Sequence, residues 1–410
     1  MTASTPVVSG GGPLLGVRVL DLTTFLSGPS ASQLLGDLGA DVIKVEAPEG
    51  DMTRTVPPYF VGPDSAYYLA NNRNKSSIVI NLKTAEGCRL LERLAGEVDI
   101  VIENYRPGVL KRLGLAVPEL LVRHPALIWA SISGFGQDGP WCDRPAYDLI
   151  VQALSGAMSL TGEPDGRPVR LGIPVGDLVA GLYAVIGLLA AWADRLRSGS
   201  GRWVDVAMLD SQLAMLSYQA VYNTVGGVTP AAQGNRHDSI PTYRTFVGSD
   251  GRELAVTAST QRMFEELCHA LGLPELIDDP RFVDPAGRLA NRVELWELLE
   301  KEFAAAPAAA WVERLGERRV PAALIKNVPE AIQDARESDR GMVREMTHPD
   351  GRRVEVLGNP VKFRGEPRGE LRYPPPLGEH TSKILTNLLG LPSDHIAHLT
   401  ADGVIYQGPG

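Results

Sequence analysis

The chain has 410 residues, of which 44% are hydrophobic and 22% charged, as in an ordinary globular protein. This apolar content excludes disorder as the main state, and the length predicts two or three domains of roughly 100–200 residues each. A formal net charge of -9 argues against a general nucleic-acid binder, which would carry a basic face. Three scattered cysteines, Cys88, Cys142 and Cys268, exclude a disulfide framework and favour the reducing cytoplasm.

Two segments bear on targeting. Residues 1–13 lack the basic and long apolar regions of a signal peptide, so they predict a flexible tail. The most apolar uncharged stretch, 178–193, is shorter than the roughly 18 residues of a membrane span. We therefore expect a buried helix there and no membrane partner.

The first two hundred residues alternate strand-like and helix-like patterns. Such alternation predicts βαβ units and a mostly parallel sheet. The predicted strands are 17–23, 41–47, 77–82, 99–105 and 127–133, with helices over 28–39, 84–98 and 178–196, followed by the segment 203–216.

The pattern changes near Gly226, where a loop of Gly, Pro and Gln predicts a linker. The region 235–325 then predicts a smaller α+β domain. Its predicted elements are a hairpin over 242–257 and helices over 261–271, 292–305 and 308–317. A second hairpin is predicted over 351–363, and a terminal helix from His380.

Several familiar motifs are excluded. The run Gly134–Gly139 fits G-x-G-x-x-G, but a dinucleotide loop must open a helix, and Pro140 and Pro145 delay any helix until about Tyr147. We therefore expect no nicotinamide or flavin cofactor. The seven histidines do not cluster at ligand spacing, so no metal site is expected.

Asp177 stands directly before the long apolar helix and follows Gly176. One interpretation is an ordinary N-cap, for which Asp is among the best residues. The other is a nucleophile, because the helix dipole favours an ionised carboxylate and the glycine leaves room for a substrate. From the residues alone, both remain open.

Polar residues also gather near other predicted element ends. Tyr147 and Asp148 begin a helix, and taken alone this pair is better explained as an ordinary acidic residue at a helix N-terminus. The runs 73–77 and 104–108 combine cations with amide side chains beside strands. Ligands of open α/β sheets bind at strand ends, and phosphates favour Arg and Lys, although a solvated loop is the alternative for each run.

Short runs in a fixed order cover nearly the whole chain: 16–23, 27–29, 38–46, 74–77, 99–108, 133–136, 146–148, 155–156, 176–177, 201–206, 234–237 and 377–381. Together they resemble the class III coenzyme A transferases, also called the CaiB/BaiF family. That family includes formyl-CoA transferase, carnitine CoA-transferase and the α-methylacyl-CoA racemases.

The resemblance implies a large Rossmann-like α/β domain with a parallel sheet, built from both chain ends, 1–225 and 331–410. A smaller α+β domain, 226–330, is inserted between them. It also implies an interlocked homodimer that uses acyl-CoA and a carboxylic acid as substrates. No permanently bound cofactor is implied.

The resemblance also assigns site residues. The nucleophile falls on Asp177, which would form an anhydride with the donor acyl group and then an aspartyl-CoA thioester. The substrate pocket falls on Leu26, Tyr147, Asp148 and Gly176. The positions for CoA fall on Ala47, Asn74, Ile80, Lys83, Asn104, Tyr105, Arg106 and Arg112.

Within the family, racemases carry a histidine base at the position of Tyr147. A tyrosine with an ordinary pKa near 10 is a poor base at neutral pH, which favours a transferase. Formyl-CoA transferase has a glutamine at the position of Leu26 and an arginine at that of Ala47, so a bulkier acyl group or a dicarboxylate such as succinate is expected. A racemase or epimerase and a non-catalytic acyl-CoA-binding protein remain the alternatives.

Overall fold

The computed structural model describes residues 11–367 and 369–408, and the predicted tail lies largely outside them. The described residues form two compact units. The first consists of 11–157, 170–226 and 338–408, and the second of 158–169 and 227–337. The second unit therefore differs from the predicted insertion 226–330, because it includes 158–169 and continues to Glu337.

The first unit is built on a seven-stranded sheet with the order β14-β5-β2-β1-β6-β7-β8. Neighbouring strands are parallel except for β14, which pairs antiparallel to β5 at one edge. The mostly parallel sheet is thus confirmed. The strands are β1 Arg18–Asp21, β2 Asp41–Glu46, β5 Lys75–Ile80, β6 Ile100–Glu103, β7 Ile128–Ser133, β8 Trp203–Ala207 and β14 Ile405–Tyr406.

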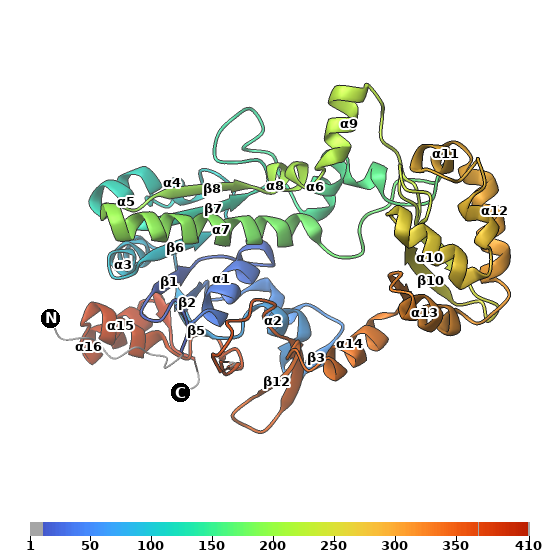
Figure 1. Cartoon of the computed structure of the whole chain (residues 1–410). Coiled ribbons are helices and arrows are strands. Elements are labelled where there is room, and N and C mark those ends of the chain that lie inside the picture. Colours follow the sequence, from blue (N-terminus) through green and yellow to red (C-terminus); the bar gives the residue numbers. More distant parts are fainter. Residues whose placement is uncertain (1–10, 368, 409–410) are drawn as a thin grey trace. The chain divides into compact units, whose positions relative to one another are not determined.

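Helices cover both faces of this sheet (Figure 1), because successive residues of each buried strand point to opposite sides. On one face α1 (Ser27–Asp37) and α7 (Val175–Ser198) pack over Val19, Val42 and Ile100. On the other face α3 (Ala85–Ala95), α5 (Val117–Arg123), α15 (Thr381–Leu389) and α16 (Ser393–Ala401) pack over Leu20, Ile43 and Val101.

By length and composition, α7 is apolar enough to cross a membrane. In this fold it is a core helix, since Ala180, Ala184 and Leu188 are fully buried against the sheet and α1. Gly181 permits this close approach, because a Cβ there would lie 2.7 Å from the backbone oxygen of Ser27. The predicted helix is confirmed and is buried on one face, whereas Leu182 and Ile186 on its other face are exposed.

Shorter elements complete the first unit. They are η1 Met52–Thr55, β3 Phe60–Val61, β4 Asp64–Ser65, α2 Ala66–Asn71, α4 Val109–Arg112, α6 Asp148–Leu154, α8 Met208–Ala214, α9 Tyr218–Gly226, β12 Val343–Thr347 and β13 Arg353–Leu357. The predicted hairpin over 351–363 is wrong in its position, because the observed hairpin starts at Val343 and ends at Leu357. Its turn lies at 348–352, where Gly351 adopts a φ of 90° and Asp350 accepts the N–H of Arg352, so the strands are β12 and β13.

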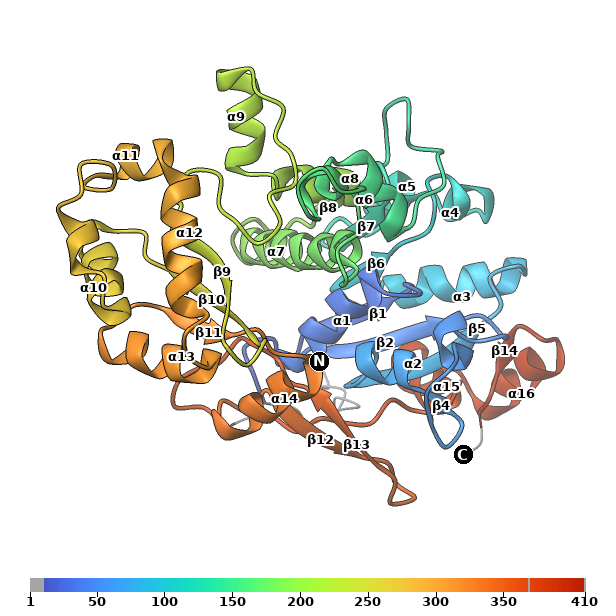
Figure 2. The ribbon, with the colours of Figure 1, turned by 90° about the vertical axis from the view of Figure 1, so that its right-hand side faces the viewer.

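The second unit contains a three-stranded antiparallel sheet with the order β11-β10-β9 and a helical layer around it (Figure 2). Its core gathers Phe246, Phe264, Phe303 and Trp311. The predicted hairpin and its three helices are confirmed. The elements are β9 Tyr243–Val247, β10 Glu253–Thr257, α10 Gln261–Leu271, η3 Pro274–Ile277, α11 Pro285–Ala290, α12 Arg292–Phe303, α13 Ala308–Glu317, β11 Ala322–Leu324 and α14 Val328–Glu337, while η2 Ala157–Leu160 lies at the boundary.

Candidate active site

Asp177 lies in the first turn of α7, two residues inside the helix that begins at Val175. The residue before the helix is Pro174, which makes no side-chain cap, so Asp177 is not the N-cap. Its carboxyl group is half-buried. Burial and, to a smaller extent, the negative charge of Asp148 raise its pKa to about 6, although a hydrogen bond from Ser27 acts in the opposite direction. Burial therefore outweighs the expected effect of the helix dipole, yet a carboxyl group of this pKa is still mostly ionised at pH 7.

Asp148 satisfies one of the free N–H groups at the start of α7. Its Oδ1 accepts the backbone N–H of Gly176 at 2.7 Å, and its Oδ2 accepts Nε2 of Gln152 at 2.7 Å. The amide oxygen of Gln152 in turn accepts the N–H of Leu171 at 2.8 Å. A Cβ at Gly176 would lie 3.0 Å from Oδ1 of Asp148, which explains the glycine. The acid at the start of α6 is therefore a cap for a different helix.

The loop between β1 and α1 lies beside Asp177. Phe25 has a φ of 70°, a left-handed conformation that is costly for a bulky residue. Its ring contacts Tyr67 and Tyr147 edge-on, with centroids 5.8 and 6.0 Å apart. Leu26 is buried, whereas Tyr147 is 62% exposed. Burial raises the pKa of Tyr67, and the negative charge of Asp177 raises it further.

The structure brings most of the positions expected for CoA to one edge of the sheet. Ala47, Ile80 and the run 104–106 lie at or just after the carboxyl ends of β2, β5 and β6. Ile80 is buried, and Lys83 is exposed and pairs with Glu49 at 3.5 Å. Arg112 ends α4, the short helix that follows the same run. Apart from Ala47 and Ile80, these residues place cations, a phenol and an amide near the edge where open α/β sheets bind ligands.

Asn74 lies at the opposite edge, immediately before β5. Its Nδ2 donates to Asp37 at 2.8 Å and its Oδ1 accepts the backbone N–H of Arg372 at 2.8 Å. The neighbouring cations are also occupied, since Arg73 pairs with Asp37 and Lys75 with Asp21, and all four side chains are buried. The run 73–77 is therefore internal, and the structure does not bring Asn74 together with the other expected CoA positions.

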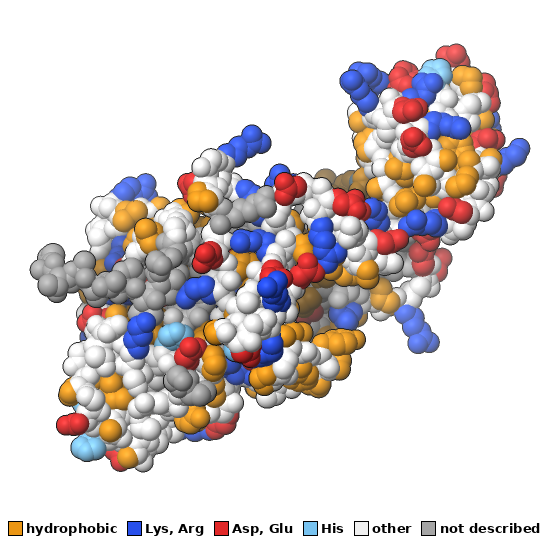
Figure 3. All heavy atoms as spheres, turned by 90° about the horizontal axis from the view of Figure 1, so that it is seen from below, with side chains coloured by type: hydrophobic (Ala, Val, Ile, Leu, Met, Phe, Trp, Pro, Cys, Tyr) orange, Lys and Arg blue, Asp and Glu red, His pale blue; other side chains and the backbone are white. Residues whose placement is uncertain are grey.

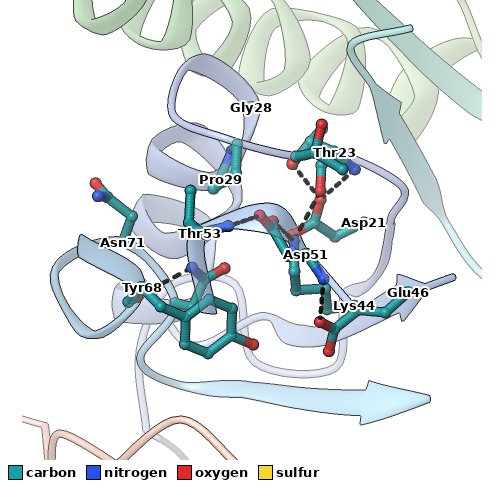
Figure 4. Close-up of polar contacts among 12 residues, drawn as sticks. Asp21, Thr23, Gly28, Pro29, Lys44, Glu46, Asp51, Thr53, Tyr68 and Asn71 are labelled. Carbon is teal, nitrogen blue, oxygen red and sulfur yellow. Dashed lines mark hydrogen bonds and ion pairs between the residues drawn. The ribbon is translucent and has the colours of Figure 1, made fainter. Parts of the chain in front are cut away.

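A buried network of charges lies under the β1–α1 loop (Figure 4). Nζ of Lys44 donates to the backbone oxygen of Thr23 at 2.7 Å and pairs with Asp51 at 2.9 Å. Asp21 accepts the N–H of Thr23 at 2.9 Å and pairs with Lys75 at 3.0 Å. Although burial alone would raise the pKa of Asp21, the two lysines lower it overall. The network fixes Thr23, from which the loop beside Asp177 begins.

One further polar side chain lies beside the start of α7. Gln212 of α8 is 2% exposed, and its Oε1 lies 3.6 Å from the position that a Cβ of Gly176 would take. Within the part of the chain that the structure describes, neither atom of its amide has a hydrogen-bond partner. Ser27, Phe25, Tyr67 and Gln212 were not predicted as site residues. Only Ser27 carried a signal, because it stands in the run 27–29 that contributes to the family resemblance.

Other features of the described residues lie outside this site or give it no further ligand. A cavity of about 550 Å³ in the first unit lies at the amino ends of the strands, lined by Asn74, Arg340, Lys362 and Arg372 among others, and not by Asp177. Among the described residues, no group of His, Cys, Asp or Glu side chains could hold a metal ion. On the face drawn in Figure 3, basic and acidic side chains are interspersed rather than sorted into one basic patch.

Comparisons with known proteins identify the family of the chain. The model of CoA-transferase family III matches residues 14–381. A succinyl-CoA:glutarate CoA-transferase of Mus musculus is 40% identical over 96% of this chain and 91% of its own length. A succinate–glutarate CoA-transferase of Agrobacterium fabrum is 39% identical over 92% of this chain and 96% of its own length. The crystal structure of a CaiB/BaiF family protein from Brucella suis superposes with a TM-score of 0.80 at 38% identity, covering 92% of this chain and 99% of that one. The chain therefore belongs to CoA-transferase family III and is an enzyme that transfers coenzyme A between acyl-CoA and carboxylate.

Proposed function

We propose that this enzyme moves coenzyme A from a dicarboxylyl-CoA, with succinyl-CoA as the first candidate, to a second carboxylic acid, and that Asp177 is its covalent nucleophile. The observation that carries the proposal is the environment of Asp177, a half-buried carboxylate at the start of α7 beside Ser27 and Asp148. The named activities of the mouse and Agrobacterium relatives support the choice of succinyl-CoA.

The proposed reaction proceeds by successive acyl transfers. The Asp177 carboxylate attacks the thioester carbonyl, the C–S bond breaks, and CoA leaves as a thiolate. The thiolate then attacks the Asp177 carbonyl of the resulting anhydride, which releases the donor acid and leaves an aspartyl-CoA thioester. The acceptor carboxylate attacks this thioester, and the same steps in reverse give the new acyl-CoA and free Asp177. Each step exchanges one acyl bond for another, which is the advantage of covalent catalysis.

The partly buried position of Asp177 suits this sequence. A carboxylate that is poorly hydrated is a better nucleophile than one in water, because less solvent must be displaced on attack. Its pKa of about 6 still leaves it ionised at neutral pH. Ser27 favours the ionised form of Asp177 by hydrogen bonding, so the loop beside the site also helps to keep the nucleophile ionised.

Substrate exchange tests the function. Purified enzyme with succinyl-CoA and a panel of mono- and dicarboxylic acids should form new acyl-CoA with release of succinate, and Asp177→Ala should form none. Solvent deuterium should not enter the α-carbon of a 2-methylacyl-CoA. Deuterium incorporation without CoA exchange would instead establish the racemase alternative.

We further propose that the enzyme works as a homodimer. Exposed apolar side chains on two helices of the first unit support this: α7 presents Leu182 and Ile186, and α9 presents Val221 and Val225. The residues of each pair are four positions apart and so lie on one face of their helix, and an apolar face of this kind favours burial against another chain. Sedimentation equilibrium should give twice the chain mass at micromolar concentration, and a monomer with full activity would contradict the proposal.

A further inference from the structure

Asn104 makes a set of hydrogen bonds that its expected role in CoA binding does not require. Its Oδ1 accepts the backbone N–H of Thr24 at 2.9 Å, and its Nδ2 donates to the backbone oxygen of Thr24 at 2.8 Å. The same Nδ2 reaches Oγ of Ser27 at 3.4 Å, a longer contact. Both N–H groups of the amide are therefore already engaged within the protein, which leaves none to donate to a phosphate or to the amides of CoA.

The loop that Asn104 contacts contains a strained residue, so its conformation depends on support from the surrounding structure. Thr24 is exposed and is followed by Phe25 in a left-handed conformation, which is costly for a bulky residue. Such a conformation persists only where the surroundings over-determine it. Lys44 and Asp21 hold Thr23 on one side of this stretch, and α1 begins at Ser27 on the other. Between these two supports, Asn104 takes both backbone groups of Thr24.

Ser27 connects Asn104 to Asp177. Its hydroxyl accepts from Asn104 and hydrogen-bonds the Asp177 carboxylate, which lowers the pKa of that carboxyl group. The other titratable groups that act on or respond to Asp177 are Asp148 from α6 and Tyr67 from α2, and Asn104 contacts neither of them. The path from Asn104 to the carboxylate thus runs through Ser27 and the backbone of its loop.

We propose that Asn104 is a positioning residue, which holds the 24–27 loop so that the Ser27 hydroxyl meets Asp177, rather than a contact for CoA. This inference rests on the proposed role of Asp177 as nucleophile. The proposed role connects the run 104–106, which is expected to bind CoA, with the chemistry at Asp177. The connection is made by the side chain of Asn104, which lies 80 positions from Thr24 in the sequence.

The test is the split between kcat and KM in Asn104→Ala, with Asn104→Asp as a second variant that keeps the acceptor for Thr24 but loses both donors. We expect kcat to fall about tenfold or more, since small misplacements of reacting groups have effects of this size. The KM for acyl-CoA should change less than about threefold. The acid limb of the pH profile of kcat/KM should move to higher pH, because Asp177 loses the hydrogen bond that favours its ionised form.

Ser27→Ala should reproduce the same changes, and the double variant Asn104→Ala/Ser27→Ala should be no worse than the poorer single variant, because the two act along one path. Asn291→Ala, which removes a surface amide of the second unit that also bonds two backbone oxygens, is the matched control. A raised KM with unchanged kcat would overturn the proposal in favour of direct CoA contact. Independent, additive effects of Asn104→Ala and Ser27→Ala would overturn it as well.

The two proposals fail in different ways. If Asp177→Ala retained exchange activity, the nucleophile would be wrong whatever Asn104 does. If Asp177→Ala were inactive but Asn104→Ala kept the kcat and the pH profile of the wild type, only the positioning role would be lost.

Discussion

The carboxylate of Asp148 accepts the backbone N–H of Gly176 at 2.7 Å, and so a negative charge lies next to Asp177 at the start of α7. This arrangement satisfies a helix N-terminus from outside the helix and raises the pKa of the neighbouring acid at the same time. One residue thereby links the packing of α6 on α7 to the ionisation of the proposed nucleophile.

Replacement of Asp148 should therefore change the pH dependence of the reaction. Asp148→Asn removes a charge that raises the pKa of Asp177, so that pKa should fall and the acid limb of kcat/KM, expected near pH 6, should move to lower pH. The measurement is a pH–rate profile at subsaturating acyl-CoA. An acid limb that moved upward, or did not move, would show that Asp148 does not act on Asp177 by its charge.

Gln212 offers a prediction about stability. A buried amide without partners costs roughly 1–3 kcal/mol, and a methionine has a similar shape without the polar atoms. Gln212→Met should accordingly raise the midpoint of thermal unfolding. A lowered midpoint would mean that the amide is satisfied in solution, for instance by a bound water or by a second chain.

A substitution among the buried charges under the β1–α1 loop should lower the stability of the protein. Lys44→Met would leave the buried Asp51 without its cation and deprive Asp21 of one of its two, and breaking such a buried pair costs about 3–5 kcal/mol. Lys83→Met is the control, because the pair of Lys83 with Glu49 is largely exposed and contributes little. Urea unfolding at pH 7 compares the two, and equal losses would contradict the assigned network.

Glu103, at the carboxyl end of β6, should make stability depend on pH. Burial raises its pKa from 4.5 to about 7. Between these values the folded state binds more protons than the unfolded state, so the free energy of unfolding falls as the pH rises through this window. Glu103→Gln removes the ionisation that causes this loss of stability. Between pH 5 and pH 8 the free energy of unfolding of the variant should therefore rise by up to about 3 kcal/mol relative to that of the wild type. Parallel stability curves for the two proteins over that range would refute the assignment.

The sheet and most of its helices could be predicted because their signals are local. Buried parallel strands form short apolar runs, and the helices between them carry their own periodicity. The hairpin predicted over 351–363 lies too far along the chain, because the prediction starts at Gly351 and leaves out the strand that precedes the turn, β12. Gly351 marked the turn itself.

Residues of the candidate site could be named only where the sequence carries a motif. Gly176-Asp177 and the run 104–106 could be named, but the contacts of Asn104 with Thr24 join residues 80 positions apart. No periodicity records such a pairing. Asn74 was grouped with the CoA positions although it precedes its strand, and parallel strands place their first residues at the edge opposite their last. Phe25 and Tyr67 come together only through the packing of α2 on α1.

The most direct test of the central claim is mass spectrometry of the enzyme after incubation with succinyl-CoA. The proposed mechanism predicts an adduct with the mass of CoA less water on the peptide that contains Asp177. That adduct should disappear on addition of an acceptor acid and should be absent from Asp177→Ala. An adduct on a different residue, or full exchange activity in Asp177→Ala, would contradict the mechanism.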